Sequence, residues 1–279
     1  MPTRCRCWTS WWPRPKRKRS KALKRVFITG ASSGIGAALA AHYAAQGCTL
    51  GLLARRGDAL AQLAASLPNP QLHRCYPADV TDHAAVRAAA ESFLAHAGGC
   101  DIVIASAGIS HGTITELAQD LPVFESIVAT NVTATVATFA PFVAAMRAQG
   151  TPARLVGIGS VAGVRGLPGG GAYSASKAAL RVYCEALRVE LRASPIKVVT
   201  IAPGYINTPM TQKNKYPMPF LMAPAAFAAA AARSIARGAS YRVIPWQMGV
   251  VARLLCALPN WLYDRAFAKA PHKARKGTS

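Results

Sequence analysis

Short apolar segments alternate with longer alanine-rich segments along most of this chain, and a glycine-rich turn follows the first of them. The short segments have the length and the β-branched or apolar character of strands, whereas the segments between them have the length of helices. Strands that alternate with helices form βαβ units around a parallel sheet. We expect strands at residues 26–29, 49–54, 72–76, 101–105, 154–158, 197–202 and 241–244, and helices at residues 34–46, 58–67, 82–97, 131–148, 173–193 and 224–237.

This alternation predicts an α/β fold, a Rossmann-like doubly wound parallel sheet flanked by helices in a single domain. The 279 residues suffice for one large domain with a substantial core, and no composition shift or repeat divides residues 25–245. Residues 1–24 are expected to form a basic, disordered tail. Residues 246–279 are expected to form a C-terminal amphipathic helical extension with a basic end, packed on the domain or on a partner subunit, or in contact with a membrane surface.

The positive charge of the chain is concentrated at its two ends. The formal net charge is +22, and residues 1–25 contain ten Lys or Arg and no acidic residue. A basic run by itself supplies only non-specific attraction to nucleic acid, so no specific nucleic-acid partner is expected. The charges are not followed by the apolar segment that a secretory signal requires. Trp8, Trp11 and Trp12 lie among them, which leaves attachment to a membrane surface as an alternative.

The seven cysteines are scattered along the chain. They form no Cys-x-x-Cys pair with histidine partners, so no metal site is predicted. Reduced thiols in a cytoplasmic protein are the expected state, with several of them packed as small core residues.

The glycine-rich turn has the features of a dinucleotide phosphate site, because it directly follows the first strand and begins the first helix. Gly30 permits a tight turn, Gly34 lets the backbone approach a pyrophosphate, and Gly36 allows close packing of helix and strand. The helix N-terminus adds free N–H groups and a positive dipole end. The alternative is a tight turn without a ligand. The turn residues expected to bind the cofactor are Gly30, Ser32, Ser33, Gly34, Ile35 and Gly36.

The end of the second strand indicates which dinucleotide binds. An NAD site usually has Asp or Glu there to bind the ribose hydroxyls, whereas this chain has Ala54 followed by Arg55 and Arg56. A carboxylate would repel a 2′-phosphate, but a guanidinium would bind it through charge-assisted hydrogen bonds. These residues therefore favour NADPH over NADH. A solvated arginine pair at the start of a helix is the alternative.

Tyr173 and Lys177 are four residues apart in a predicted helix, so their side chains lie on one face. An ammonium beside a phenol favours the ionised phenol, and we expect Lys177 to lower the pKa of Tyr173. Tyr173 would then be a proton donor and acceptor for a carbonyl–alcohol pair. Ser160 upstream and Pro203-Gly204 downstream strengthen this interpretation, because the pair alone occurs often by chance.

Together these motifs resemble those of the short-chain dehydrogenase/reductase family in its compact single-domain form, over the span from Arg25 to about Ile244. The resemblance implies that Asp79, followed by Val80, contacts the adenine. Where the family has Asn-Asn-Ala-Gly after the fourth strand, this chain has Ala105-Ser106-Ala107-Gly108, and Ser106 is expected to supply one hydrogen bond at the cofactor site. The resemblance also places Pro203, Gly204 and Thr208 at the nicotinamide side, with Tyr173 and Lys177, and gives the catalytic set Asn131, Ser160, Tyr173 and Lys177.

The activity that the resemblance implies is NADPH-dependent interconversion of a carbonyl and an alcohol by direct hydride transfer. In this mechanism Tyr173 donates a proton to the forming alkoxide and Ser160 hydrogen-bonds the same oxygen. Lys177 would also hold the nicotinamide ribose, and Asn131, at the start of its helix, would anchor a water that links Lys177 to solvent. The alternatives are a regulator that binds NADP(H) without turnover and a peripheral membrane-associated reductase that modifies lipids.

Residues 205–222 are predicted to cover the substrate. Their apolar composition, with two methionines near the end, favours a lipophilic ketone or aldehyde. A surface loop that packs against a partner subunit is the alternative. The resemblance further implies a homodimer or homotetramer that uses helices 131–148 and 173–193. We expect the protein in the cytoplasm, with peripheral attachment at the inner membrane surface as the alternative.

Overall fold

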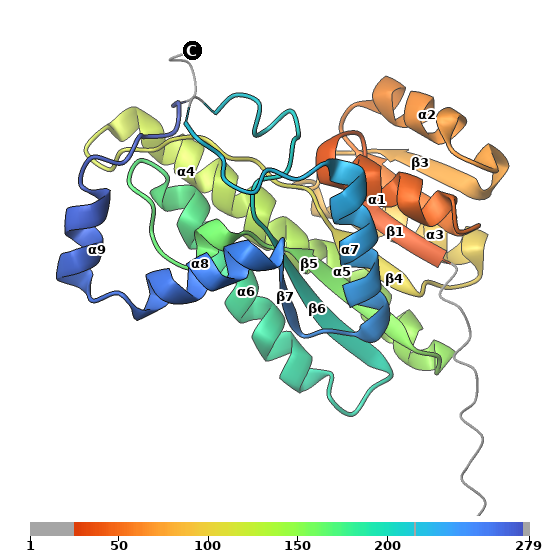
Figure 1. Ribbon diagram of the computed structural model, residues 1–279. Helices are drawn as coiled ribbons and strands as arrows, with labels where there is room; N and C mark the ends of the chain where they lie inside the picture. The colour runs from red at the N-terminus through yellow and green to blue at the C-terminus, as the bar shows by residue number, and fades with distance from the viewer. Residues whose placement is uncertain (1–24, 215, 276–279) are drawn as a thin grey trace, which may run out of the picture.

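The seven apolar segments form one parallel sheet in the computed structural model, which describes residues 25–214 and 216–275 (Figure 1). The strand order is β3-β2-β1-β4-β5-β6-β7, with every neighbouring pair parallel. The predicted fold class is therefore confirmed. The strands are β1 (Arg25–Thr29), β2 (Thr49–Ala54), β3 (His73–Pro77), β4 (Ile102–Ala105), β5 (Ala153–Ile158), β6 (Ile196–Pro203) and β7 (Tyr241–Ile244).

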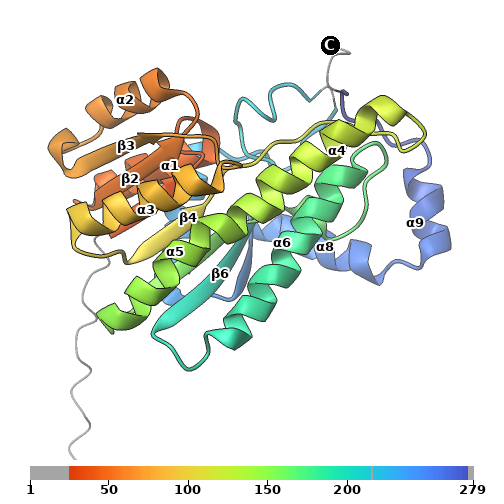
Figure 2. The same ribbon diagram turned by 180° about the vertical axis from the view of Figure 1, so that it is seen from behind.

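Helices cover both faces of this sheet, as the views from the front and from behind show (Figures 1 and 2). One face carries α1 (Gly34–Ala44), α2 (Gly57–Ser66) and α7 (Pro224–Arg237). The other face carries α3 (His83–Ala97), α5 (Ala134–Gln149) and α6 (Gly171–Glu190). Short 3-10 helices lie in the connections of the described chain, namely η1 (Pro70–Leu72), η2 (Ala118–Asp120) and η4 (Val161–Gly163), and η3 (Ala129–Thr133) is a π-helical turn that leads directly into α5.

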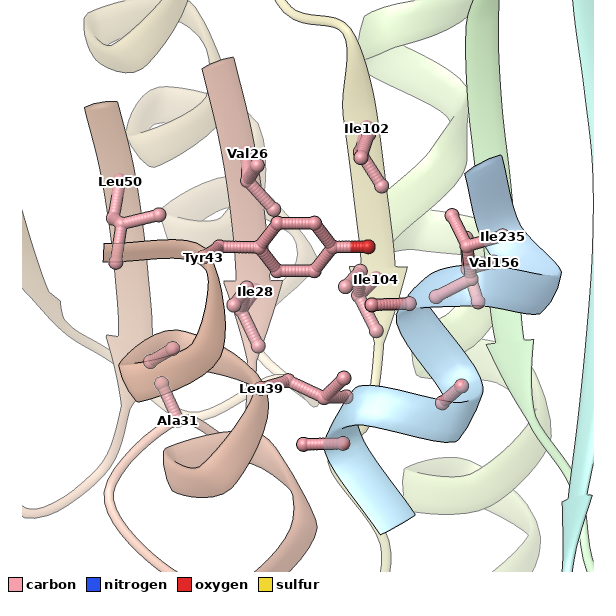
Figure 3. Packing of buried hydrophobic residues seen from close by; sticks show 14 of the residues in the cluster. Val26, Ile28, Ala31, Leu39, Tyr43, Leu50, Ile102, Ile104, Val156 and Ile235 are labelled. Atoms are coloured by element: carbon pink, nitrogen blue, oxygen red, sulfur yellow. The ribbon is translucent and has the colours of Figure 1, made fainter. Parts of the chain in front are cut away.

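The sheet separates two apolar cores because successive side chains of a strand point to opposite faces. In β1, Val26 and Ile28 belong to the core under α1 and α7, whereas Phe27 belongs to the core under α3, α5 and α6. Tyr43 of α1 lies across the first core, with Ile235 of α7 nearby (Figure 3). Both cores are built from fully buried aliphatic and aromatic side chains, which hold the strand ends in fixed positions.

Strands β2 and β3 add to one side of β1. The chain then returns to the centre of the sheet, where β4 pairs with β1 on its other side, and the later strands add outward from β4. The connections at the carboxyl ends of β1 and β4 therefore diverge and leave a crevice, which is where open α/β sheets bind their ligands. The glycine-rich turn and the segment after β4 are both at this crevice.

The helix expected to begin at Asn131 begins at Leu121 instead. The helix α4 (Leu121–Val128) continues through a π-helical turn, η3, into α5, and Asn131 lies in that turn. Pro122 in the first turn of α4 is the start signal that the sequence offers there, since a proline fits the first turn of a helix. By length and composition alone, residues 118–149 could cross a membrane, but in this fold they pack along the sheet between α3 and α6 (Figure 2).

The C-terminal extension forms two helices, α8 (Trp246–Ala257) and α9 (Asn260–Phe267), and its last described residues turn back over the domain (Figure 1). Arg165, in the connection before α6, joins this extension to the domain. Its guanidinium donates to the carbonyls of Leu255 and Leu258 at 3.3 and 3.1 Å and lies 4.1 Å from the ring centre of Tyr263. The tail expected over residues 1–24 lies outside the described residues.

Candidate active site

The glycine-rich turn fits tightly between β1, α1 and the segment after β4. Gly30 has φ +68°, and a Cβ there would lie 2.7 Å from the backbone of Ala107. Gly34 has φ +56°, and a Cβ at Gly36 would collide with the carbonyl of Gly30. These glycines are therefore required by close backbone packing and by left-handed conformations, as the sequence predicts. The result is a concave backbone surface at the start of α1.

The N-terminus of α1 has no side-chain cap among the described residues. Ser33 precedes the helix in an extended conformation, and its hydroxyl makes no capping bond. The first turn contains no acidic residue. Arg56 reaches over the same turn, and its guanidinium donates to the hydroxyl of Ser32 at 3.2 Å. Free N–H groups, a positive dipole end and a guanidinium therefore meet here, which suits an anionic phosphate.

Arg55 and Asp79 lie together at the ends of β2 and β3. The guanidinium of Arg55 is 3.8 Å from the carboxylate of Asp79, and both side chains are exposed. Asp79 also accepts hydrogen bonds from the N–H and the hydroxyl of Thr81, at 2.9 and 2.8 Å. Those bonds from Thr81, aided by the nearby Arg55, lower the pKa of the Asp79 carboxyl. The site thus places an exposed guanidinium beside a hydrogen-bonded carboxylate at one end of the crevice.

A cavity of about 320 Å³ runs from these residues across the carboxyl ends of the strands. A larger hollow of about 660 Å³, between α6, β7 and α8, contains none of the site residues that the sequence indicates. In contrast, all the predicted cofactor-binding residues line the smaller cavity: Gly30, Ser32, Ser33, Gly34, Ile35, Gly36, Arg55, Arg56, Asp79, Val80, Ser106, Tyr173, Lys177, Pro203, Gly204 and Thr208.

Ser160 and Tyr173 face each other across the inner wall of this cavity. Ser160 follows β5, and its hydroxyl accepts a hydrogen bond from the N–H of Ala162 at 3.1 Å. Tyr173 lies in the first turn of α6, which comes close to η4 because Gly163 has no side chain; a Cβ there would lie 2.7 Å from the backbone of Lys177. The close packing of these two elements therefore brings the serine and the tyrosine together.

The expected lowering of the Tyr173 pKa is wrong for this structure. Burial raises the pKa of Tyr173, and a hydrogen bond with Ser160 only partly opposes that effect. The ammonium of Lys177 lies 5.8 Å from the tyrosine ring centre and donates instead to the carbonyl of Ile158 at 2.9 Å. Burial also lowers the pKa of Lys177 to about 8. Desolvation thus outweighs charge attraction at both groups and favours their neutral forms.

Asn131 links three elements instead of capping a helix. Its side-chain oxygen accepts from the N–H of Ile109 at 2.9 Å, and its amide donates to the carbonyl of Ile109 and to the hydroxyl of Ser176, both at 3.0 Å. Asn131 is fully buried and does not line the cavity. The structure therefore brings Ser160, Tyr173 and Lys177 to the cavity wall and places Asn131 behind them. The role of Asn131 in a proton path stays a prediction.

Ser106 follows β4, and its expected hydrogen bond at the cofactor site stays a prediction. The Ser106 hydroxyl makes no hydrogen bond within the part of the chain that the structure describes, although Ser106 lines the cavity. The backbone after β4 is instead tethered to β1, because the hydroxyl of Thr29 accepts a hydrogen bond from the N–H of Ala107 at 3.4 Å. A buried threonine at the end of a strand was the only sequence signal for this role, and it is a weak one.

The far wall of the cavity is formed by the segment after β6. Gly204 lies against α8, and a Cβ there would lie 2.7 Å from the side chain of Met248. Thr208 lies near Gly34 and bonds to Thr211, whose hydroxyl accepts from the N–H of Thr208 at 3.0 Å. The missing side chain of Gly204 therefore lets the C-terminal extension support this wall.

The loop expected over the substrate comes near Tyr173. Tyr205 and Met222 hold its two ends together through a backbone hydrogen bond of 2.9 Å. Between them Tyr216 lies close enough to Tyr173 for the tyrosine charges to interact, and its ring centre is 6.4 Å from that of Tyr205. Aromatic rings therefore border the catalytic residues on this side.

The C-terminal residues also reach the site, which the sequence did not predict. The ammonium of Lys273 donates to the hydroxyl of Ser110 at 2.7 Å and lies 5.4 Å from the ring centre of Tyr173. The only sequence signal was a basic end, which is usually solvated. No cluster of three or more metal-binding side chains occurs among residues 25–214 and 216–275.

Comparison with known proteins gives consistent matches to one family. A family model described as short chain dehydrogenase matches residues 24–218. An uncharacterized oxidoreductase from Myxococcus xanthus is 37% identical over 251 residues, which is 87% of this chain and 96% of the relative. One from Mycobacterium tuberculosis is 35% identical over 252 residues, with the same coverage.

A solved structure shows the same arrangement. The structure of a 3-ketoacyl-(acyl-carrier-protein) reductase from Brucella melitensis, complexed with NADH, superposes with a TM-score of 0.72 at 26% identity, covering 79% of this chain and 96% of that one. The range of the family model, residues 24–218, includes the glycine-rich turn, Ser160, Tyr173 and Lys177. The chain therefore belongs to the short-chain dehydrogenase/reductase family and is an NAD(P)-dependent oxidoreductase.

Proposed function

We propose that the protein is an NADPH-dependent carbonyl reductase that acts on a lipophilic ketone or aldehyde. The observation that carries this proposal is the meeting of Ser160, Tyr173 and Lys177 at one end of a cavity whose other end is lined by Arg55 and Arg56. The first group fits a reacting carbonyl, and the second fits a phosphate on the adenosine ribose.

The residues present fit such a cofactor. The uncapped start of α1 and the glycine backbone can receive the pyrophosphate, and Arg55 and Arg56 stand where a second anionic group would lie. NADPH, when bound, supplies the hydride that adds to the carbonyl carbon. Lys177, buried beside the tyrosine, donates one hydrogen bond to the carbonyl of Ile158 and would use its remaining N–H donors to hold the ribose hydroxyls.

Tyr173 and Ser160 act on the carbonyl oxygen as negative charge develops on it. Tyr173 holds the proton that the forming alkoxide needs, and burial moves its pKa further above the ordinary value for tyrosine. The hydroxyl of Ser160 can donate to the same oxygen and stabilise its developing charge. Oxidation of an alcohol would run the same transfers backwards and would need the phenolate form of Tyr173.

The apolar character of residues 205–222 supports the lipophilic part of the proposal. Phe220 and Leu221, two neighbouring large apolar side chains of this segment, are exposed, and adjoining exposed apolar side chains can mark a ligand or partner contact. Tyr205 and Tyr216 continue this apolar border toward Tyr173.

The deciding experiment follows NADPH oxidation with aldehydes and ketones of increasing chain length, in the wild type and in Tyr173→Phe. We expect turnover that improves with chain length and falls about 10²–10⁴-fold in the variant, the usual contribution of a positioned proton donor. Tyr183→Phe, another tyrosine of α6 that does not line the cavity, is the matched control. NADPH binding without turnover of any carbonyl would instead favour the regulator.

A second proposal concerns the outer surfaces. We propose that the protein forms a homodimer or homotetramer through α5 and α6, whose outer faces expose the valines Val136, Val182 and Val189.

We also propose peripheral membrane contact through α8 and α9, where Trp246, Leu254 and Trp261 are 66%, 63% and 70% exposed. Tryptophan and leucine on the outside of short helices are typical of surfaces that enter a membrane interface.

A further inference from the structure

The last described residues of the chain, 268–275, pass beside Ser110 and Tyr173; we call this segment the C-terminal strap. It leaves α9 and returns to the segments that follow β4 and precede α6 (Figures 1 and 2). The N–H of Gly112 donates to the carbonyl of Ala274 at 2.9 Å. The strap is therefore tied to the domain by backbone pairing as well as by its side chains.

The strap is anchored at its end by a two-point ion pair. The guanidinium of Arg275 donates to both carboxylate oxygens of Asp120 at 2.9 Å. Asp120 precedes α4 and is 5% exposed, and it also accepts from the N–H of Ile114 at 2.9 Å. A bidentate arginine–carboxylate pair with one buried partner holds its geometry better than an exposed pair. The end of the strap thus has a defined position.

Two glycines make room for the strap. A Cβ at Gly112 would collide with the carbonyl of Lys273, and a Cβ at Gly169 would lie 2.8 Å from the Cβ of His272. Gly169 also has φ +66°, a conformation that glycine adopts readily. The strap is therefore accommodated by the domain at its middle as well as at its end, and Lys273 lies between these contacts.

Lys273 points from the strap toward the catalytic residues. Its ammonium is 2.7 Å from the hydroxyl of Ser110 and 5.4 Å from the ring centre of Tyr173. Within residues 25–214 and 216–275, no carboxylate lies within ion-pair distance of this ammonium. Burial without a charged partner lowers the pKa of Lys273 to about 8. A half-buried ammonium in this position has donors that the domain does not use.

We propose that Lys273 and Ser110 form a substrate subsite for a carboxylate, so that the enzyme reduces oxo acids in preference to their neutral counterparts. This proposal rests on the proposed reductase function and names its substrate class. The ammonium donates directly to the carboxylate. The Ser110 hydroxyl accepts from Lys273 and is free to donate its own hydrogen to the same group. A carboxylate there lies beside Tyr173, and the carbonyl of the same molecule can reach its proton.

The charge of the subsite favours a single carboxylate over a phosphate. Lys273 is the cation that faces Tyr173 from the strap, and the neighbouring Arg275 is already occupied by Asp120. One ammonium and one hydroxyl match the two oxygens of a carboxylate. The rings of Tyr205 and Tyr216, which lie 6.4 Å apart between their centres, suit the apolar remainder of the molecule.

The test compares oxo acids, with the carboxylate α, β or γ to the carbonyl, against their methyl esters. We measure kcat/KM with NADPH for each pair and take the acid-to-ester ratio. We expect this ratio to be about ten or more for at least one position of the carboxylate relative to the carbonyl, because a charge-assisted hydrogen bond in a partly desolvated site contributes at least that much. In Lys273→Met we expect that ratio to fall about tenfold, mainly through KM.

The matched control is Lys269→Met, which removes an exposed lysine of the same strap and is expected to keep the wild-type ratio. Ser110→Ala leaves the strap backbone untouched and should lower the ratio about threefold, which keeps the test decisive if Lys273→Met does not fold. An acid-to-ester ratio at or below one for every position in the wild type would overturn the subsite. So would an unchanged ratio in Lys273→Met. Absence of turnover for acids, esters and simple ketones alike would instead refute the reductase function.

Discussion

Arg55 and Arg56 occupy the end of β2, where their guanidinium groups line the cofactor cavity. If they bind the 2′-phosphate, replacing both by alanine should weaken NADPH binding about 10–100-fold, since hydrogen bonds to charged groups contribute roughly 1.5–3 kcal/mol. NADH, which has no such phosphate, should bind about as before. Fluorescence titration of both cofactors measures the change in their Kd ratio.

The control for this pair is Arg87→Ala on the exposed side of α3, which removes a positive charge far from the cavity. It should leave both dissociation constants unchanged. Equal losses for NADPH and NADH in the double variant would show that the arginines bind the shared pyrophosphate or only attract anions in general.

Lys177 makes the stability of the protein depend on pH in a defined direction. Its folded-state pKa is about 8, below the ordinary value of 10.5, so the unfolded chain binds more protons between these values. The cost of burying the charge is therefore fully present below pH 8 and is relieved as the pH rises toward 10.5. We expect the free energy of unfolding of the wild type, relative to Lys177→Met, to increase by roughly 2–3 kcal/mol between pH 7 and pH 10.

Urea unfolding of both proteins at the two pH values gives this difference, and other titrating groups cancel because they occur in both. Lys197→Met, on an exposed position of β6, should show no such change relative to the wild type. A difference that stays constant or reverses between pH 7 and pH 10 would mean that the ammonium of Lys177 is solvated in the folded protein.

At the scale of elements, Arg165 joins the catalytic domain to the C-terminal extension. It donates to two carbonyls at the end of α8 and stacks on Tyr263 of α9, whose hydroxyl donates to the carbonyl of Gly166 at 2.7 Å. Arg165→Ala leaves those carbonyls without their partner. We expect faster amide hydrogen exchange across residues 255–275, with little change in the sheet, because Arg165 contacts both helices of the extension and, among the described residues, no strand of the sheet.

Arg188→Ala, on the exposed side of α6, is the control and should leave the exchange of residues 255–275 unchanged. Faster exchange in the sheet as well as the extension would show instead that Arg165 supports the whole domain. If the strap carries the subsite, Arg165→Ala should also lower the preference for oxo acids.

At the scale of the whole molecule, the apolar outer face of α8 and α9 predicts association with lipid bilayers. Trp246, Leu254 and Trp261 are the large exposed side chains of this face. Replacing both tryptophans by alanine should lower binding to anionic vesicles at least about tenfold in a sedimentation assay, because each buried tryptophan side chain contributes apolar area. Phe124→Ala, an exposed aromatic residue of α4, is the control.

The full chain must be used, because residues 1–25 are also basic and contain three tryptophans. Binding that is unchanged in the double variant but lost when residues 1–24 are removed would assign membrane contact to the N-terminal residues. A wild type that does not sediment with vesicles would refute membrane contact through either segment.

The sequence alone determined the fold class, because hydrophobic periodicity and turn residues are local signals. All seven strands lie at or near their predicted ranges, and Gly30, Gly34 and Gly36 have the conformations or close contacts that their spacing predicts. The position of the cofactor cavity followed as well, since parallel strands bring their carboxyl ends to one edge of the sheet. Short-range patterns sufficed for all of these features.

The tertiary structure decided what depends on contacts between distant segments. The side chain of Asn131 bonds to Ile109 and Ser176, so the helix continues through it, and local signals for a helix start there were misleading. Burial reversed the expected pKa shift of Tyr173, because desolvation depends on all the surrounding elements. Lys273 reaches Tyr173 only because two helices and an ion pair return the chain to the site. No pattern within a short window of sequence encodes a contact between residues a hundred positions apart.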